Sequence, residues 1–458
     1  MISVLDEEGR VSRVRLLAPL RIRDFRLLWT GMTLSLLGDG VLLVALAWQA
    51  YQLDNRPVAM SLVGVALTVP QVLLVLVGGV LSDRFERRKV MLTADVVRGL
   101  ALAVLAALSV SGHLVLWHLV AFAGVYGAAS AFFMPAFEAL VPSIVPEDRL
   151  TEANALDQFV RPATLWLLGP ALGGLLIGAA GPGWAFALDA GTFVVSVACL
   201  LRLHEPVESA PGRVESAPGH LESALGRGES ALGSGAPEAD APTTVSGVIA
   251  ELKDGFRFVK GEPWLWATFV AATFTYLLFL GPTEVLLPYL VKNELGGDAH
   301  DLGLILAAGG VAALVAAFAI GQSGLPRKTM TFTYLMWVVA TLSVAGYGLA
   351  QNRWQAMAAA AFVSGFEAVG AVAWVTTKQR LVPGHLLGRV SSFDWFISIA
   401  LVPLSYAVTA PVAALVGTRT TLLGSGVIGA LVTFAFLFVP GVRAPDRDPA
   451  PVALVEAA

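Results

Sequence analysis

Apolar runs long enough to cross a lipid bilayer recur along the whole chain. A helix needs about 20 mainly apolar residues to cross roughly 30 Å of hydrocarbon, and about twelve runs approach that length. They lie near Leu27–Tyr51, Val58–Leu81, Val90–Val110, Leu116–Phe137, Ala155–Ala179, Trp184–Leu201, Trp264–Leu290, Leu302–Ile320, Met330–Ala350, Trp354–Thr376, Phe393–Val416 and Leu422–Val439. We therefore predict an all-α integral membrane protein with twelve transmembrane helices.

The composition supports this class and argues against several functions. Of the 458 residues, 56% are hydrophobic and 14% are charged, whereas soluble domains have about 25% charged residues. A net charge of -4 argues against nucleic acid as a partner, and the single cysteine, Cys199, excludes an intramolecular disulfide and a cysteine-cluster metal site. No compact His, Cys and Asp constellation and no nucleotide-binding loop is evident. We expect no enzyme activity, no cofactor, no metal and no obligate protein partner.

Basic residues predict the orientation, because Lys and Arg gather in cytoplasmic loops. Loops on one side contain Arg21, Arg23, Arg26, Arg84, Arg87, Arg88, Lys89, Arg149, Arg202, Lys253, Arg257, Lys260, Arg327, Lys328, Lys378, Arg380 and Arg389. The other side has Arg56, Lys292, Arg353 and Arg419. We expect both termini and the loop between spans six and seven in the cytoplasm, in the plasma (inner) membrane. The N-terminus lacks the pattern of a cleaved signal peptide.

The loop between spans six and seven differs in composition from the rest of the chain. Residues 206–242 include four copies of a seven-residue unit marked by Glu208, Glu215, Glu222 and Glu229. Pro and Gly recur and no apolar seam exists, so a flexible linker is favoured over a coiled coil. The next residues place apolar and basic side chains on separate faces, which predicts an interfacial helix. The predicted parts are an N-terminal segment 1–24, a six-helix bundle 25–204, a linker 205–245, an interfacial helix 246–262, a second bundle 263–440 and a tail 441–458.

The two halves also echo one another. Glycine-rich stretches at Gly124 and Gly365 occupy the fourth span of each half, and Leu140 and Leu381 begin "LVP" at the same offset after them. Two parallel six-span halves joined by a cytoplasmic linker are a transporter architecture.

A candidate family signature begins at the end of the second span. It consists of Gly79-Val80-Leu81-Ser82-Asp83-Arg84, followed by Arg87-Arg88. These residues resemble the loop signature that the major facilitator superfamily has between its second and third helices, with Glu86 where a glycine is usual. Gly169, Pro170, Gly173 and Gly174 resemble the Gly-Pro-x-x-Gly-Gly motif of its drug/proton antiporters, with Leu165 in place of the usual earlier glycine. Residues 142–156 and 251–265 resemble the branch that holds macrolide and enterobactin exporters. The resemblance implies two pseudo-symmetric six-helix bundles and antiport of amphipathic small molecules against protons by alternating access. One departure is the fourth span, which lacks the arginine of many proton-coupled exporters.

The signature loop suggests a cytoplasmic gate. Asp83 can lie near the positive N-terminal end of span eleven, and Arg84, Arg87 and Arg88 can pair with Asp394, Glu138 or lipid phosphate. Such a latch would hold the halves together when the cavity faces outward. The alternative is ordinary positive-inside topology without a switching role.

Ionisable side chains within the spans need a reason, because each costs roughly 2.5–3.5 kcal/mol at mid-bilayer on insertion scales. Asp39 and Glu367 fall near the midplane at about 1.5 Å per residue, and Arg161 can neutralise either Asp39 or Asp157. Arg98 has Asp95 one turn away. The candidates for proton coupling are Asp39, Glu367, Asp157 and Arg161. Glu367 has no basic residue near it in its span, so it can carry the coupling proton or be a neutral acid bonded to backbone.

The expected substrate cavity is lined by aromatic side chains and one more acid. Its candidates are Trp48, Tyr126, Phe133, Tyr276, Glu284, Phe366 and Trp374. Gly169 and Gly173 permit close helix packing. We expect protons and a small molecule as ligands; the alternatives are a siderophore or lysolipid transporter on the same fold, and a non-transporting receptor or scaffold.

Overall fold

The structure, a computed structural model, describes residues 15–146, 149–204 and 256–447. Within these ranges it does not describe the side chains of residues 15–17, 76–84, 138–139, 142, 151, 154–155, 158, 384–385 and 388. The expected linker 205–245 therefore lies outside the described residues. Of the expected interfacial helix, residues 256–261 are described and helical.

The N-terminal half contains six membrane-length helical segments. A short helix η1 (Arg15–Arg21) precedes α1 (Arg23–Leu53), α2 (Pro57–Arg84), α3 (Arg87–Val110), α4 (Leu116–Ile144), the composite α5 (Leu150–Pro162), η3 (Ala163–Leu168) and α6 (Gly169–Ala180), and α7 (Pro182–Leu201). The C-terminal half repeats this number. It consists of α9 (Pro263–Gly281) with η4 (Pro282–Leu286), α10 (Leu287–Tyr289) and η5 (Leu290–Glu294), then α11 (Ala299–Ser323), α12 (Thr329–Leu349), α13 (Arg353–Leu381), α14 (Gly384–Ile399) with α15 (Val402–Val416), α16 (Thr418–Phe436) and the short α17 (Ala444–Arg447).

Twelve helical segments of the described chain are long and apolar enough to cross a membrane. This confirms the predicted fold class. The seventh span runs on to Glu294, beyond the expected end at Leu290, so Glu284 lies well inside it.

Two of the spans contain π-helical stretches, and prolines explain their positions. The stretch η3 lies between Pro162 and Pro170, and η4 begins at Pro282 with Pro288 shortly after it. Proline has no N–H to donate, so the local hydrogen-bond ladder rearranges around it. π-Helical turns occur frequently at functional sites.

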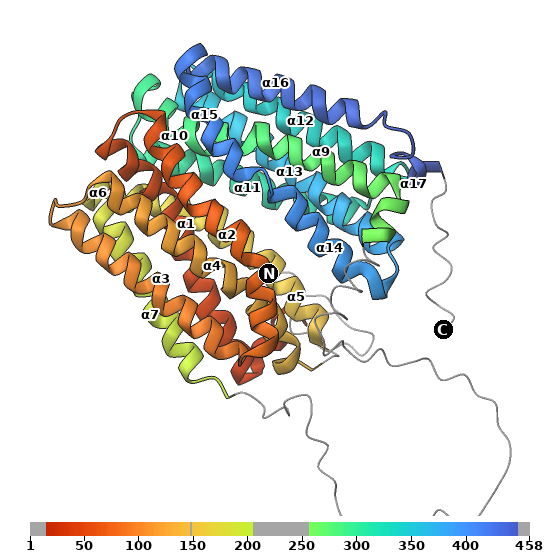
Figure 1. The fold of residues 1–458 in the computed structure, drawn as a ribbon, viewed down its shortest axis with the longest axis horizontal. Coiled ribbons are helices and arrows are strands. Elements are labelled where there is room, and N and C mark those ends of the chain that lie inside the picture. The colour runs from red at the N-terminus through yellow and green to blue at the C-terminus, as the bar shows by residue number, and fades with distance from the viewer. Residues whose placement is uncertain (1–14, 147–148, 205–255, 448–458) are drawn as a thin grey trace, which may run out of the picture.

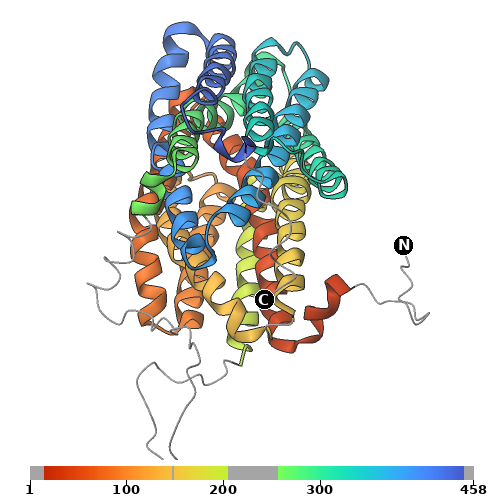
Figure 2. The same ribbon diagram turned by 90° about the vertical axis from the view of Figure 1, so that its right-hand side faces the viewer.

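The two halves lie side by side, the first coloured red to yellow and the second green to blue (Figures 1 and 2). We call the end where α7 finishes and α9 begins the linker end, and the opposite end the far end. The halves meet where α6 and η3 pack on α11 and where α2 packs on α15. One hydrophobic core cluster includes Tyr51 of the first half and Leu290 of the second, whereas two further clusters each belong to one half at the linker end. The halves therefore share a core toward the far end and keep separate cores at the linker end.

The last described helix packs back on the C-terminal half. Asp446 of α17 accepts hydrogen bonds from the backbone N–H groups of Met330 and Thr331 at 2.8 and 3.0 Å. It caps the start of α12, because these N–H groups have no partner within their own helix. The first residues of the expected tail 441–458 are thus part of the folded bundle.

Candidate functional site

A cavity of about 350 Å³ lies between the two halves. Its lining residues are Leu43, Ala47, Trp166, Tyr276, Phe279, Leu280, Thr283, Glu284, Leu287, Pro288, Leu302, Leu306, Gly309, Gly310, Ala313, Tyr347, Ala360, Val363, Ser364 and Glu367. They come from α1 and η3 of the first half and from α9, η4, α10, α11, α12 and α13 of the second. Two π-helical stretches contribute, through Trp166 of η3 and Glu284 of η4. This central cavity has the size and mainly apolar lining of a small-molecule site.

Two carboxylates, Glu284 and Glu367, lie in this apolar lining, and no Lys, Arg or His is among the lining residues. Glu367 also borders a smaller cavity of about 50 Å³ between α9, α12 and α13. Within the described part of the chain, neither carboxylate has a hydrogen-bond or ion-pair partner. The central cavity therefore offers negative charge or hydrogen-bond donors to a ligand and no positive charge.

Polar contacts join the two halves at the far end. The Tyr51 hydroxyl donates to the carbonyl of Val285, and the ammonium of Lys292 donates to the carbonyl of Tyr51. Asn55 and Asn293 exchange amide hydrogen bonds. These bonds join the end of α1 and the residues after it to the seventh span.

The glycines of the antiporter-like motif lie at the seam between the halves. A Cβ on Gly169 would lie 2.5 Å from Cα of Gly40, and one on Gly173 would lie 3.0 Å from the carbonyl oxygen of Val41, both on α1. A Cβ on Gly174 would lie 2.8 Å from the carbonyl oxygen of Ala299 on α11. Gly303 of α11 faces Pro170 equally closely, since its Cβ would lie 2.5 Å from that carbonyl oxygen. One face of the motif thus packs on α1, and the other packs on the second half.

Asp39 belongs to a charged cluster within the N-terminal half. It accepts a hydrogen bond from the Tyr126 hydroxyl. Near it, the buried Arg98 pairs with the fully buried Asp95, which also accepts a 2.6 Å hydrogen bond from Ser196. The Arg98 guanidinium lies 4.5 Å from the centroid of the Phe133 ring and 4.7 Å from that of Phe193. The basic residue of the cluster that contains Asp39 is therefore Arg98, whereas the sequence suggested Arg161 as its partner.

Arg161 pairs with Asp157, its neighbour one turn earlier. Its Nε and Nη2 donate to the two carboxylate oxygens at 3.2 Å each. The contact confirms the expected pairing of Arg161 with an acid, and it is made with Asp157 rather than Asp39. A role of this pair in proton coupling stays a prediction.

At the linker end, Asp394 of α14 binds partners from α13. It accepts hydrogen bonds from Lys378 Nζ at 2.7 Å and from Trp374 Nε1 at 2.8 Å. Asp83, Arg84, Gly79 and Glu138 of the expected gate lie outside the described side chains. The latch therefore stays a prediction.

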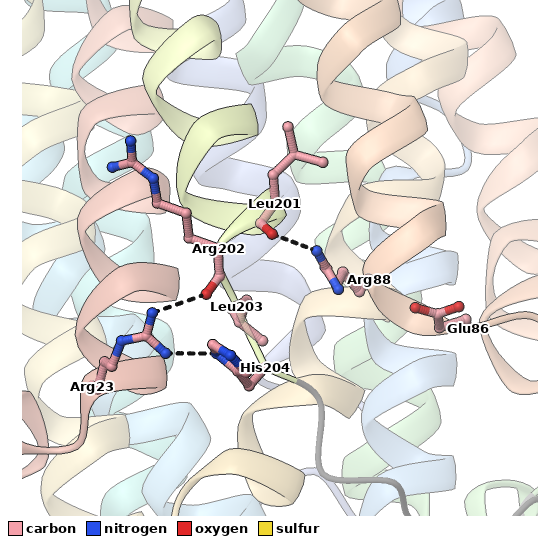
Figure 3. A pocket seen from close by; sticks show the side chains of 7 residues that line it. All are labelled: Arg23, Glu86, Arg88, Leu201, Arg202, Leu203 and His204. Atoms are coloured by element: carbon pink, nitrogen blue, oxygen red, sulfur yellow. Dashed lines mark hydrogen bonds between the residues drawn. The ribbon is translucent and has the colours of Figure 1, made fainter.

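Arg88 of the expected gate lies beside a linker-end pocket of about 500 Å³ shared by α1, α3 and the end of α7 (Figure 3). Its Nε and Nη2 donate to the carbonyls of Leu200 and Leu201, each at 2.7 Å. Arg23 reaches the same helix end through the carbonyl of Arg202 and the ring of His204. Cations at a helix C-terminus stabilise its free carbonyls, so Arg88 fastens α7 to α3. Arg87 follows directly after the loop, at the first position of α3.

Of the expected cavity residues, Tyr276 and Glu284 line the central cavity. Trp374 instead packs among Trp264, Phe269 and Trp337 in the linker-end core of the second half. Phe366 borders a separate hollow of about 270 Å³. Of the others, Tyr126 and Phe133 surround Arg98, and Trp48 lies under Lys292 Nζ, 5.7 Å from its ring centroid.

Sequence reasoning missed Asp189, a fully buried acid in α7. An aspartate in the middle of an apolar run carries the same sequence signal as Asp39, so this residue was open to detection. It missed Tyr51, Asn55 and Asn293 at the far end, where only the packing of the two halves reveals a contact.

Comparison with known proteins places this architecture in a family. The model of the family described as "Transmembrane secretion effector" matches residues 14–225. The multidrug efflux pump Tap of Mycolicibacterium fortuitum is 25% identical over 89% of this chain and 94% of its own length. The MFS-type transporter YfiS of Bacillus subtilis is 26% identical over 67% of this chain and 66% of its own length. The enterobactin exporter EntS of Escherichia coli is 25% identical over 80% of each chain. The chain is therefore similar to transporters of the major facilitator superfamily.

Solved transporter structures agree with this chain in fold. The nucleoside transporter NupG superimposes with a TM-score of 0.60 at 12% identity, covering 92% of this chain and 98% of NupG. A bacterial homologue of ferroportin, in an inward-facing state, gives 0.61 at 16% identity, covering 91% and 98%. With an efflux pump and an exporter among its relatives and twelve membrane-length segments in its described part, the chain is a multi-pass membrane transporter and not an enzyme. The resemblance read from the Asp83 loop and from the glycine motif is confirmed.

Proposed function

We propose that this transporter exports amphipathic small molecules that carry a positive charge, in exchange for protons, by alternating access. The observation that carries the proposal is the central cavity, in which Glu284 and Glu367 face an otherwise apolar and aromatic lining without a basic side chain. An amphipathic cation satisfies both parts of such a site, because its apolar body fills the lining and its charge neutralises a carboxylate. The relatives Tap and EntS, named as an efflux pump and an exporter, support export rather than import.

Glu367 is the proposed coupling residue. An uncompensated carboxylate in an apolar cavity is unfavourable as a charged group, so it binds either a proton or a cation. Competition between the two at one carboxylate is the simplest form of antiport. The cavity then releases substrate when it takes up a proton.

The charge of the substrate sets the driving force. A neutral substrate exchanged for one proton moves one charge, which supplies about 2.3 kcal/mol per 100 mV and supports roughly a fortyfold gradient, at about 1.4 kcal/mol per tenfold. A monovalent cation exchanged for one proton moves no net charge, so the pH gradient alone drives export. One pH unit then supports about a tenfold gradient of the cation.

The Glu367→Gln variant tests this coupling in liposomes. Glutamine mimics the protonated carboxyl and cannot exchange a proton for a cation, so uphill export driven by a pH gradient is expected to be lost. Downhill exchange of substrate is expected to survive with a lower affinity for the cation, because Glu284 keeps its charge. Glu262→Gln is the matched control, because Glu262 accepts a hydrogen bond from Trp264 Nε1 at the start of α9, outside the central cavity. Persistent uphill export by Glu367→Gln would move the coupling role to Asp39, to be tested by Asp39→Asn in the same two assays.

The proposal places the linker end and both termini in the cytoplasm. The basis is the excess of Lys and Arg in the loops of that end. Protease added to intact cells is expected to leave residues 206–242 uncut. Cleavage there from outside would show the opposite orientation, in which the proposed transport would be import.

A siderophore exporter is the second candidate, favoured by the similarity to EntS. Substrate-stimulated proton flux in liposomes, measured with amphipathic cations, then siderophores, then lysolipids, separates the candidates. If siderophores stimulate proton flux and amphipathic cations do not, a siderophore replaces the cation as the proposed substrate.

A further inference from the structure

A buried acid that the proposed function does not use lies in the N-terminal half. Asp189 of α7 is 0% exposed, and its Oδ2 has no hydrogen-bond partner among the described residues. Its Oδ1 lies 3.1 Å from the Thr192 hydroxyl, which also lies 2.7 Å from the backbone carbonyl of Asp189. The hydroxyl has one hydrogen to donate and can serve only one of these acceptors fully. The carboxyl is therefore poorly satisfied by its own helix.

The neighbouring helix α1 is shaped to admit this carboxyl. A Cβ on Gly38 would lie 2.0 Å from Asp189 Oδ1 and 2.6 Å from the Thr192 hydroxyl, so a side chain at position 38 would exclude Asp189 from its place. Asp39 follows Gly38 directly and is close enough to Asp189 for the two carboxyl groups to interact electrostatically. Two acids from different helices thus lie together inside the bundle.

The other charged and titratable groups that face Asp189 have been placed above. Helix α1 contributes Asp39, α3 contributes Asp95 and Arg98, and α4 contributes Tyr126. Helix α6, which also packs on α7, contains no titratable residue. Arg98 therefore serves three aspartates, since Arg161, the other guanidinium that acts on Asp39, is already paired with Asp157.

The distribution of hydrogen bonds shows which aspartate lacks support for a negative charge. Asp95 accepts from Arg98 and from the Ser196 hydroxyl, and Asp39 accepts from the Tyr126 hydroxyl. If all three acids were ionised, the cluster would carry two uncompensated charges inside the bilayer, which is strongly unfavourable. We infer that Asp189 holds a proton in this conformation and is a proton-binding site of the N-terminal half.

Helix α1 links this site to the central cavity. Leu43, one helical turn after Asp39, and Ala47, two turns after it, both line the central cavity. A movement of α1 in the transport cycle would change the contact at Gly38 and with it the surroundings of the Asp189 proton. This second step rests on the proposed function, and release of the proton during export follows from it.

Infrared spectroscopy of the full-length protein in lipid nanodiscs tests the site without transport. A protonated carboxyl has a C=O stretching band separate from that of a carboxylate. We expect such a band to shift when aspartate is labelled with carbon-13 at its side-chain carboxyl, and to be lost in Asp189→Asn. Asp301→Asn, which removes an acid paired with Arg353 at 2.9 Å, is expected to keep the band.

Either of two results would overturn the inference. If no protonated-carboxyl band of the wild-type protein shifts with labelled aspartate, no aspartate is protonated, whether or not the variants fold. If the band is lost in Asp39→Asn and kept in Asp189→Asn, the proton belongs to Asp39.

Proton-to-substrate ratios in liposomes then test the link to export. Asp189→Asn is expected to lower the number of protons that enter per substrate exported, while substrate still moves. An unchanged ratio with a confirmed infrared band would leave Asp189 as a site that keeps its proton and would overturn the linking step alone. A wild-type protein that moves substrate without protons would sink the proposed function and leave the infrared result standing.

Discussion

The acids of the N-terminal half and the two acids of the central cavity all lie within membrane-length helical segments, but in opposite surroundings. Asp95 pairs with the Arg98 guanidinium and accepts a hydrogen bond from the Ser196 hydroxyl. Within the described part of this half, Arg98 is the only positively charged group that faces Asp95. Glu284 and Glu367 face a cavity and have no partner within the described chain. The presence of an acid within a span is thus weak evidence for its role. The stronger evidence is whether the protein itself supplies the counter-charge or leaves that to a ligand.

The largest expected effect comes from removing the counter-charge of the N-terminal cluster. Arg98→Met leaves Asp95 buried without its cation, and breaking a buried pair in this way destabilises by about 3–5 kcal/mol. The check is thermal unfolding of the purified protein, with Asp95→Asn/Arg98→Met expected to recover part of the loss. If Arg98→Met were as stable as the wild type, the Asp95–Arg98 pair would have no structural role. The contrast with the acids of the central cavity would then be wrong.

A smaller loss is expected from Lys378→Met in the C-terminal half. Lys378 and Asp394 are paired at 2.7 Å with side chains 8% and 16% exposed, so losing this charge-assisted bond costs about 1.5–3 kcal/mol. Glu367→Gln, measured in the same unfolding assay, is expected to leave stability unchanged or higher. A clear destabilisation by Glu367→Gln would mean that this carboxylate has a structural partner after all.

The Glu284→Gln variant sharpens the ligand side of the comparison. We expect the affinity for a monovalent amphipathic cation to fall about tenfold, or about 1.4 kcal/mol, because one of the two cavity carboxylates is neutralised. An uncharged analogue of the same shape is the control and should bind as before in an equilibrium binding assay. Parallel loss for both molecules would show that Glu284 acts on cavity shape and not on charge.

The smallest effect is expected at Asp54 and Arg56, an exposed pair between α1 and α2. The Arg56 guanidinium donates to both Asp54 oxygens, at 2.8 and 2.6 Å, and lowers the pKa of that carboxyl. A lowered pKa stabilises the fold above the usual aspartate value of about 3.9, and the contribution is lost as the pH falls through the lowered value. Arg56→Gln should leave the melting temperature at pH 7 unchanged, since exposed pairs contribute little. If Arg56→Gln lowered the melting temperature as much as Arg98→Met, burial of an ion pair would not determine its contribution to stability.

Much of the fold follows from local signals in the sequence, and much of the site does not. Hydropathy located the spans because a helix in lipid must be apolar over a fixed length, and the Asp157–Arg161 pair was accessible because residues four apart share a helix face. The partners of Asp39 come from other helices, so no spacing within α1 indicates Tyr126 or Arg98. Trp374 illustrates the same limit, since an aromatic residue in a span reads alike whether it faces a cavity or a core.

The crossing of α6 and α11 limits which substitutions this sequence can accept. Gly174 and Gly303 meet backbone to backbone, with the Cβ of a residue at 303 only 2.9 Å from Cα of Gly174. A larger residue on one helix cannot be offset by a smaller one opposite, because the opposite residue is already the smallest. Second-site suppressors of a Gly174 or Gly303 substitution should therefore arise away from the contact, in residues that tilt or slide one of the two helices, and a suppressor screen would map the hinge on which the halves turn.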